Sequence, residues 1–209
     1  MDTAAKIREA FMHYVLENEQ VPKTIFKLAQ AAQLKEEEVY EHYDSVEAVE
    51  NDIWRGIFAE TRHRIESEEV YASYSAREKM LAFYYTWIEV LKANRSYARL
   101  SAHPEDLLFG TPGYMRSFHE SFREFINVLL LEGRETQEIA ERPLLIDTYP
   151  RIFWRQAMLV LRFWLRDRSR AFEKTDAYIE KAVNFAFDLM GKTALDSAFD
   201  FARFAFQNR

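Results

Sequence analysis

The residues that could do chemistry in this chain form no complete catalytic motif. There is no cysteine, which excludes a thiol nucleophile, a thiolate zinc site and a disulfide. Glu60 and His63 have the Glu-x-x-His spacing of di-iron sites, but such sites need a second copy on a facing helix, and the sequence has none. The five histidines are scattered: His13, His42, His63, His103 and His119. We therefore predict a protein that is not an enzyme, with no catalytic residue, cofactor or metal.

Three arginines could bind an anion. Arg155, Arg162 and Arg166 lie at i, i+7 and i+11 of a very apolar stretch, 148–169, and so share one face of the expected helix. Two interpretations stay open. The face is solvated or ion-paired, or Arg162 anchors an anionic group of a ligand inside an aromatic pocket.

The most informative element is the stretch 24–49, TIFKLAQAAQLKEEEVYEHYDSVEAV. Thr24 is a suitable N-cap for a first short helix, and Gln33 begins a turn. A second short helix is expected over 35–42, with Val39 and Tyr40 on its buried side. Ser45 then caps a longer helix. Two helices joined by a tight turn make a helix-turn-helix, whose second helix usually reads DNA.

This stretch resembles the DNA-binding segment of the TetR family of bacterial repressors. The resemblance implies an N-terminal DNA-binding segment, a helical ligand-binding domain and a homodimer. Tyr40 and His42 match family positions that contact phosphate. The candidate DNA-binding residues are Thr24, Lys35, Glu38, Tyr40 and His42. The matching residues are Ile7, Ala10, Phe11, Thr24, Leu28, Ala29, Ala32, Leu34, Tyr40, His42, Tyr43, Ser45 and Glu47.

The same stretch departs from the family pattern at five positions. The family usually has Gly at the turn, where this chain has Gln33. It has a small hydroxyl residue in place of Lys35, Gly or Pro in place of Glu37, Ser or Thr in place of Glu38, and a phosphate-binding Lys in place of Val46.

Charge is distributed unevenly. Residues 1–62 hold seven Lys and Arg against thirteen Asp and Glu, so this segment carries the whole net charge of −6. Phosphate neutralisation by Lys and Arg supplies much of the affinity for DNA. An acidic reading segment therefore argues against DNA binding, although Lys23, Lys27 and Lys35 could form a local basic patch.

The rest of the chain predicts an all-α protein, because helical spacing recurs and strand-like alternation is absent. We expect a helix-turn-helix domain at 1–47 and a helical ligand-binding and dimerisation domain at 48–209. Helices are expected at 2–17, 45–69, 75–93, 97–109, 114–131, 148–169 and 174–190, with a last amphipathic helix from Thr193. No apolar run could span a membrane and no signal core begins the chain, so we expect a cytoplasmic protein.

The expected body is rich in aromatic residues. Together they make a small apolar or amphipathic ligand plausible. The stretch 148–169 is apolar on most sides, which predicts a homodimer through the C-terminal helices. The candidate pocket residues are Phe83, Tyr84, Trp87, Tyr97, Phe109, Tyr114, Phe118, Phe122, Trp154 and Arg162.

Two functions follow from these patterns. The first is a ligand-responsive transcriptional regulator that binds operator DNA as a dimer and a small apolar ligand in its C-terminal domain. The alternative is a protein with the same fold that does not bind DNA. A degenerate, acidic head would then belong to a lipid- or small-molecule-binding protein, or to a protein-interaction module.

Overall fold

The computed structural model describes residues 2–108, 110–142, 145, 147–191 and 204–207. The described residues form α-helices and short 3-10 helices and contain no strand. The prediction of an all-α fold is therefore confirmed. Most of the expected helix from Thr193 lies outside the described residues.

Most helices follow the sequence prediction closely, but the helix expected at 97–109 was wrong: the helix found there, Arg95–Ser101, already ends before His103 and Pro104. The α-helices are α1 (Thr3–Asn18), α2 (Ile25–Ala32), α3 (Glu36–Tyr40), α4 (Val46–Glu66), α5 (Ala76–Ala93), α6 (Arg95–Ser101), α7 (Arg116–Glu135), α8 (Tyr149–Arg166) and α9 (Glu173–Met190). The 3-10 helices are η1 (Glu69–Ser73), η2 (Asp106–Leu108), η3 (Gly113–Met115) and η4 (Arg170–Phe172).

Side-chain caps explain where several helices begin. The Ser45 hydroxyl accepts the N–H of Ala48 at 3.1 Å and starts α4. At the start of α5, Ser75 accepts the N–H of Glu78, and the Glu78 carboxylate accepts the N–H of Ser75. This reciprocal pair is a capping box, which satisfies donors that the helix itself leaves free.

Gly133 does not end α7, contrary to the expected end of that helix at 131. The helix continues to Glu135. A Cβ atom at Gly133 would lie 2.6 Å from Cδ1 of Ile139 and 3.1 Å from Cβ of Ala76. The glycine thus allows a close approach of the following loop and α5, which sequence spacing could not distinguish from a helix stop.

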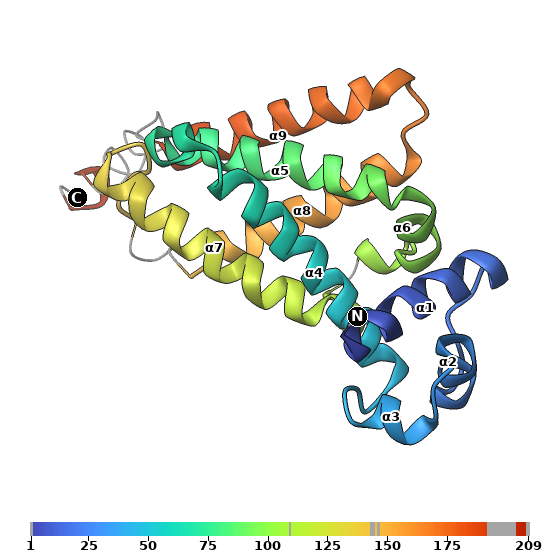
Figure 1. Ribbon diagram of the computed structural model, residues 1–209. Coiled ribbons are helices and arrows are strands. Elements are labelled where there is room, and N and C mark those ends of the chain that lie inside the picture. Colours follow the sequence, from blue (N-terminus) through green and yellow to red (C-terminus); the bar gives the residue numbers. More distant parts are fainter. Residues whose placement is uncertain (1, 109, 143–144, 146, 192–203, 208–209) are drawn as a thin grey trace.

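The helices form two connected parts, shown in Figure 1. We name α1 to α3 the head and α4 to α9 the body. The long α4 runs from the head into the body, where it packs against α5 and α7. Helix α1 packs against α4 and α6 as well as α2, so the head contacts the body through more than one helix.

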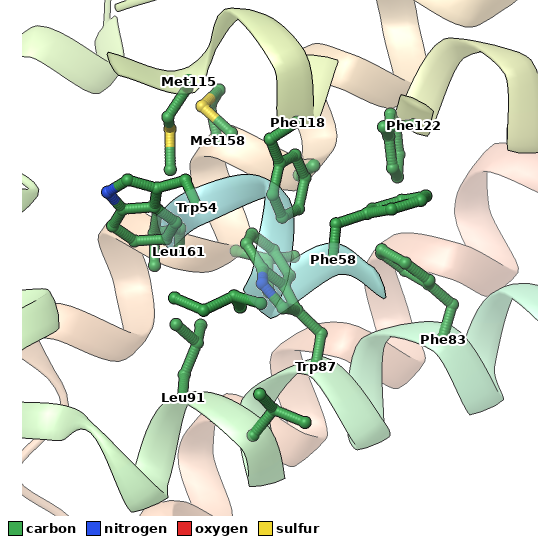
Figure 2. Close-up of a cluster of buried hydrophobic side chains, with 14 of the residues drawn as sticks. Trp54, Phe58, Phe83, Trp87, Leu91, Met115, Phe118, Phe122, Met158 and Leu161 are labelled. Carbon is green, nitrogen blue, oxygen red and sulfur yellow. The ribbon is translucent and has the colours of Figure 1, made fainter. Parts of the chain in front are cut away.

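One apolar core runs from α1 to α9 without a break. Figure 2 shows its densest part, where Trp54 and Phe58 of α4 meet Phe83 and Trp87 of α5 and Phe118 of α7. The rings of Phe58 and Phe118 lie 5.2 Å apart, edge to face. Such aromatic residues bury the largest apolar areas and dominate core stability.

Candidate nucleic-acid interface and candidate ligand site

The turn between α2 and α3 is built by backbone capping around Gln33. The Thr24 hydroxyl caps α2 by accepting the N–H of Lys27 at 3.3 Å. At the other end, Leu34 donates its N–H to the carbonyl of Ala29 at 2.9 Å, and Gln33 donates to Gln30 at 3.1 Å. This pair of bonds is a Schellman motif. Gln33 occupies its left-handed position, with φ 53° and ψ 46°, the conformation that glycine adopts most easily.

Helix α3 presents an acidic first turn and an exposed tyrosine. Glu36 and Glu37 are exposed, whereas the Glu38 carboxylate turns back and accepts the N–H of Lys35 at 2.8 Å. Val39 is buried. Tyr40, expected on the buried side, is 55% exposed. That expectation was wrong because α3 has only five residues and packs through a single apolar position.

The residues proposed to meet DNA lie on one small head. Thr24, Lys35, Tyr40 and His42 are all exposed. Thr24 and Lys35 immediately precede α2 and α3, Tyr40 is the last residue of α3, and His42 lies in the segment that follows. Their side chains are therefore accessible to a phosphate backbone, while Glu38 is already used in capping its own helix.

A polar cluster fixes the head to α4. The Tyr43 hydroxyl donates to Asp52 at 2.7 Å, and the same carboxylate oxygen accepts from Arg8 of α1 at 2.8 Å. Burial opposes ionisation of Asp52, but hydrogen bonds from Tyr43, Arg55 and Arg8 hold its pKa below the usual value. Burial and the bond to Asp52 raise the pKa of Tyr43 to about 12.

Further polar contacts fix the start of α4 to the body. The Asn51 amide donates to the carbonyl of Gly113 and accepts the N–H of Ser117, both at 3.0 Å.

Nearby, the Ser101 hydroxyl of α6 accepts from the Trp54 indole at 3.0 Å and donates to the buried Glu50 at 2.6 Å. The pKa of Glu50 is raised overall, because burial and the nearby charge of Glu47 outweigh the hydrogen bond from Ser101. A movement in α6 or α7 would therefore reach α4 directly.

Most of the candidate pocket aromatics gather in the body core. Trp87, Phe118 and Trp154 come from α5, α7 and α8, with ring centroids 5.2 Å apart for Trp87 and Phe118 and 6.0 Å for Phe118 and Trp154. The Tyr84 hydroxyl donates to the Gln156 amide oxygen of α8 at 3.0 Å. The remaining candidates in the core are Phe83 and Phe122.

Three other candidates lie away from that group. Tyr97 contacts Phe11 of α1, with ring centroids 6.4 Å apart, and Tyr114 lies 6.2 Å from the ring of Trp54. Both tyrosines are therefore near the junction of head and body. Arg162 lines a surface cavity to which no other candidate pocket residue contributes. Phe109 lies outside the described residues.

Several buried polar atoms in the body have no hydrogen-bond partner among the described residues. They include the indole nitrogens of Trp87, Trp154 and Trp164. Buried donors are nearly always satisfied in folded proteins. Within the described ranges, no group of three or more His, Asp or Glu side chains is arranged to hold a metal ion.

Helical spacing placed Arg166 on the face of Arg162, but it did not predict the other residues that surround Arg162. They lie at the end of α8, in the turn that follows and at the start of α9. The signal was present in the alternating Arg166-x-Arg168-x-Arg170. Such a charge run in a turn is usually a solvated surface, and only folding shows that it lines a cavity.

Comparison with known proteins defines the class of this helical protein. The model of the Tetracyclin repressor-like C-terminal domain matches residues 79–205, more than half of the chain. The chain therefore belongs to the TetR family of transcription regulators, which confirms the family that the sequence motif indicated. Members of this family are not enzymes, as the absence of a catalytic motif predicted. No curated protein sequence gives a significant match.

Solved structures share the fold at low identity. A TetR-family regulator from Shewanella sp. PV-4 has a TM-score of 0.65 and 13% identity, covering 92% of this chain and 100% of its own. A second, from Syntrophomonas wolfei, has a TM-score of 0.66 and 13% identity over 90% and 94% of the two chains. The fatty acid degradation regulator FadR from Bacillus halodurans has a TM-score of 0.60 and 14% identity over 90% and 95%.

Within the described residues, no helix combines the length and the apolar character needed to cross a bilayer.

Proposed function

We propose that this protein is a dimeric, ligand-responsive repressor, with DNA bound by residues 1–47 and a small apolar ligand bound by residues 48–209. The observation that carries the proposal is the helix-turn-helix head, fixed to α4 by the contacts of Asp52 with Arg8 and Tyr43. Ligand binding would shift the population between two head positions, which requires different ligand affinities in the two states.

The head geometry supports DNA binding at a small set of residues. Tyr40 and His42 are exposed beside α3, and Lys35 precedes it. A hydroxyl, an imidazole and an ammonium group are all suited to phosphate oxygens. The affinity would fall as the salt concentration rises, because each phosphate contact releases condensed counterions from the DNA.

The unpaired donors of the body support a ligand with a mainly apolar surface and a hydrogen-bond acceptor. The indoles of Trp87 and Trp154 would supply donors to that acceptor, and Phe118 and Phe122 would supply apolar walls. An acceptor that satisfies a buried donor removes a desolvation penalty of roughly 1–3 kcal/mol for each group.

DNA binding is tested by fluorescence anisotropy with duplexes from upstream of the gene, at low and at physiological salt. We expect binding that weakens steeply with salt. The double variant Tyr40→Ala/His42→Ala should weaken binding at least about tenfold, equivalent to two lost phosphate contacts. Tyr85→Ala is the matched control, since Tyr85 is an exposed tyrosine of α5 and its loss should leave DNA affinity unchanged.

A second candidate function is favoured by the acidic first turn of α3. Glu36 and Glu37 are exposed, and like charges repel a phosphate backbone. A protein that folds and dimerises but binds no duplex at low salt would support a DNA-free carrier or interaction module. Extraction with organic solvent followed by mass spectrometry would then identify a lipid or aromatic compound held by the body.

A further inference from the structure

A strongly basic groove lies where α8 turns into α9. Two adjoining cavities of about 600 and 280 Å³ share Arg166, Asp167 and Arg168. We name them together the elbow groove. It reaches from α6 across the end of α8 to the start of α9, and Figure 1 shows this turn in orange beside α6. The basic residues that line it are Arg95, Arg99, Arg162, Arg166, Arg168 and Lys174.

The acidic residues near the groove neutralise little of this charge. Asp167 is the one acidic residue among those that line the two cavities. Its carboxylate accepts the N–H groups of Ser169 at 2.8 Å and Thr175 at 3.0 Å, and the Thr175 hydroxyl at 2.7 Å. It is therefore directed into the protein. Glu105 pairs with Arg166 at 2.6 Å. In a chain with a net charge of −6, this concentration of cations needs an explanation.

Arg162 is the most informative of these cations. Its side chain is only 24% exposed, and its ion pair with Glu105 is a long one, from Nη2 to a carboxylate oxygen at 3.9 Å. Its Nε atom is buried and unpaired, and within the described part of the chain no residue accepts a hydrogen bond from it. A partly buried guanidinium with one long ion pair and no hydrogen-bond acceptor is poorly compensated. An anion in the cavity would improve that compensation.

An aromatic pair forms the other wall of the groove. Phe163 of α8 and Tyr178 of α9 stack with ring centroids 4.6 Å apart and an interplanar angle of 10°. Leu159 lies beside them in the same cavity. These apolar residues suit a flat ring or a short apolar group, while the cations that line the same cavity suit oxygen anions.

We propose that the elbow groove binds a small organic phosphate, with its phosphates at Arg162, Arg166 and Arg168 and its ring or apolar part against Phe163 and Tyr178. Guanidinium groups match phosphate oxygens in paired hydrogen bonds, and several together favour a ligand with two or more negative charges. The larger cavity, of about 600 Å³, lies within the range of volumes that bind small organic ligands. This site is separate from the aromatic core of the body and does not depend on the repressor function.

The test is calorimetric titration of the full chain with adenosine diphosphate, pyrophosphate and adenosine. We expect the diphosphate nucleotide to bind most tightly, pyrophosphate more weakly and adenosine not at all. Raising the salt concentration should weaken both phosphate ligands, because partly exposed charges are screened. Absence of binding by both phosphate ligands at low salt would overturn the proposal.

Variants locate the site. Arg162→Gln/Arg168→Gln should weaken both phosphate ligands at least about tenfold, because charge-assisted hydrogen bonds are lost. Tyr178→Leu should weaken the nucleotide but not pyrophosphate. Arg151→Gln is the matched control, because Arg151 is an exposed arginine at the opposite end of α8. Equal weakening by Arg151→Gln would show diffuse attraction and contradict a built site.

Two other occupants give distinct results. A short DNA duplex whose binding is lost in Arg162→Gln/Arg168→Gln, with no binding of the small phosphates, would assign the groove to nucleic acid. Dissociation of the dimer by the same variant, again without phosphate binding, would assign it to a second copy of this chain. Either result would overturn the proposal, and circular dichroism would verify that the variant is folded.

Discussion

At the scale of single residues, Asp167 shows how one carboxylate can hold a turn. It accepts two backbone N–H groups and one hydroxyl. Burial opposes its ionisation, but these bonds prevail and lower the pKa of Asp167 to about 2. The stabilisation is fully present above the ordinary pKa of 3.8 and is lost as the pH falls from there through about 2.

Asp167→Asn should lower the free energy of unfolding by about 2 kcal/mol at pH 7, because a shift of one pKa unit corresponds to about 1.4 kcal/mol. Denaturant unfolding measures this difference, which should shrink between pH 4 and pH 2 as the wild-type carboxylate becomes protonated. Asp147→Asn, at an exposed position, is the control and should change little. A difference that stays constant with pH would show that charge at Asp167 is not the cause.

At the scale of elements, the turn of the helix-turn-helix carries a residue that is poorly suited to its backbone. Gln33 has a left-handed conformation, which is costly for a residue with a Cβ atom. The family usually has glycine at this position, and the left-handed backbone explains that preference.

Gln33→Gly should therefore raise the free energy of unfolding by about 0.5–1 kcal/mol. In a chain of this size, each kcal/mol raises the melting temperature by roughly 2–4 °C. Thermal unfolding followed by circular dichroism measures the change. Gln30→Gly is the matched control within α2, and it should destabilise by up to about 1 kcal/mol because Gln30 is helical. Destabilisation by both substitutions would refute the account of the turn.

At the scale of the whole molecule, exposed apolar residues gather on the last two helices of the body. Phe185 is 65% exposed on α9, with Leu189 on the same helix and Ile152 on α8 also exposed. Figure 1 shows α9 along the outer edge of the body. Apolar groups in such positions are typical of protein–protein interfaces, which supports the proposed homodimer.

Phe185→Glu should convert the dimer to a monomer, because a buried, unpaired carboxylate at the interface is strongly unfavourable. Sedimentation velocity at micromolar concentration measures the species. Phe26→Glu is a control with a similarly exposed phenylalanine, 54% exposed on the head, and should remain dimeric. If Phe185→Glu also sediments as a dimer, the interface lies elsewhere on the molecule.

Local sequence patterns were sufficient to predict the helix starts and the family of this protein. Thr24, Ser45 and Ser75 mark helix starts because capping depends on neighbouring backbone groups alone. Apolar spacing likewise predicted the approximate ranges of α4, α5 and α8. The family motif depends on the same local spacing, so the class of protein was readable from residues 24–49.

Tertiary structure decided the features that depend on distant neighbours. Tyr40 is exposed because the five-residue α3 packs through Val39 alone, and Gly133 is required because Ile139 lies against it. Arg162 lines a groove rather than the aromatic core because α9 and the turn before it lie beside the end of α8. Spacing along one helix identifies a shared face, but only packing determines what that face meets.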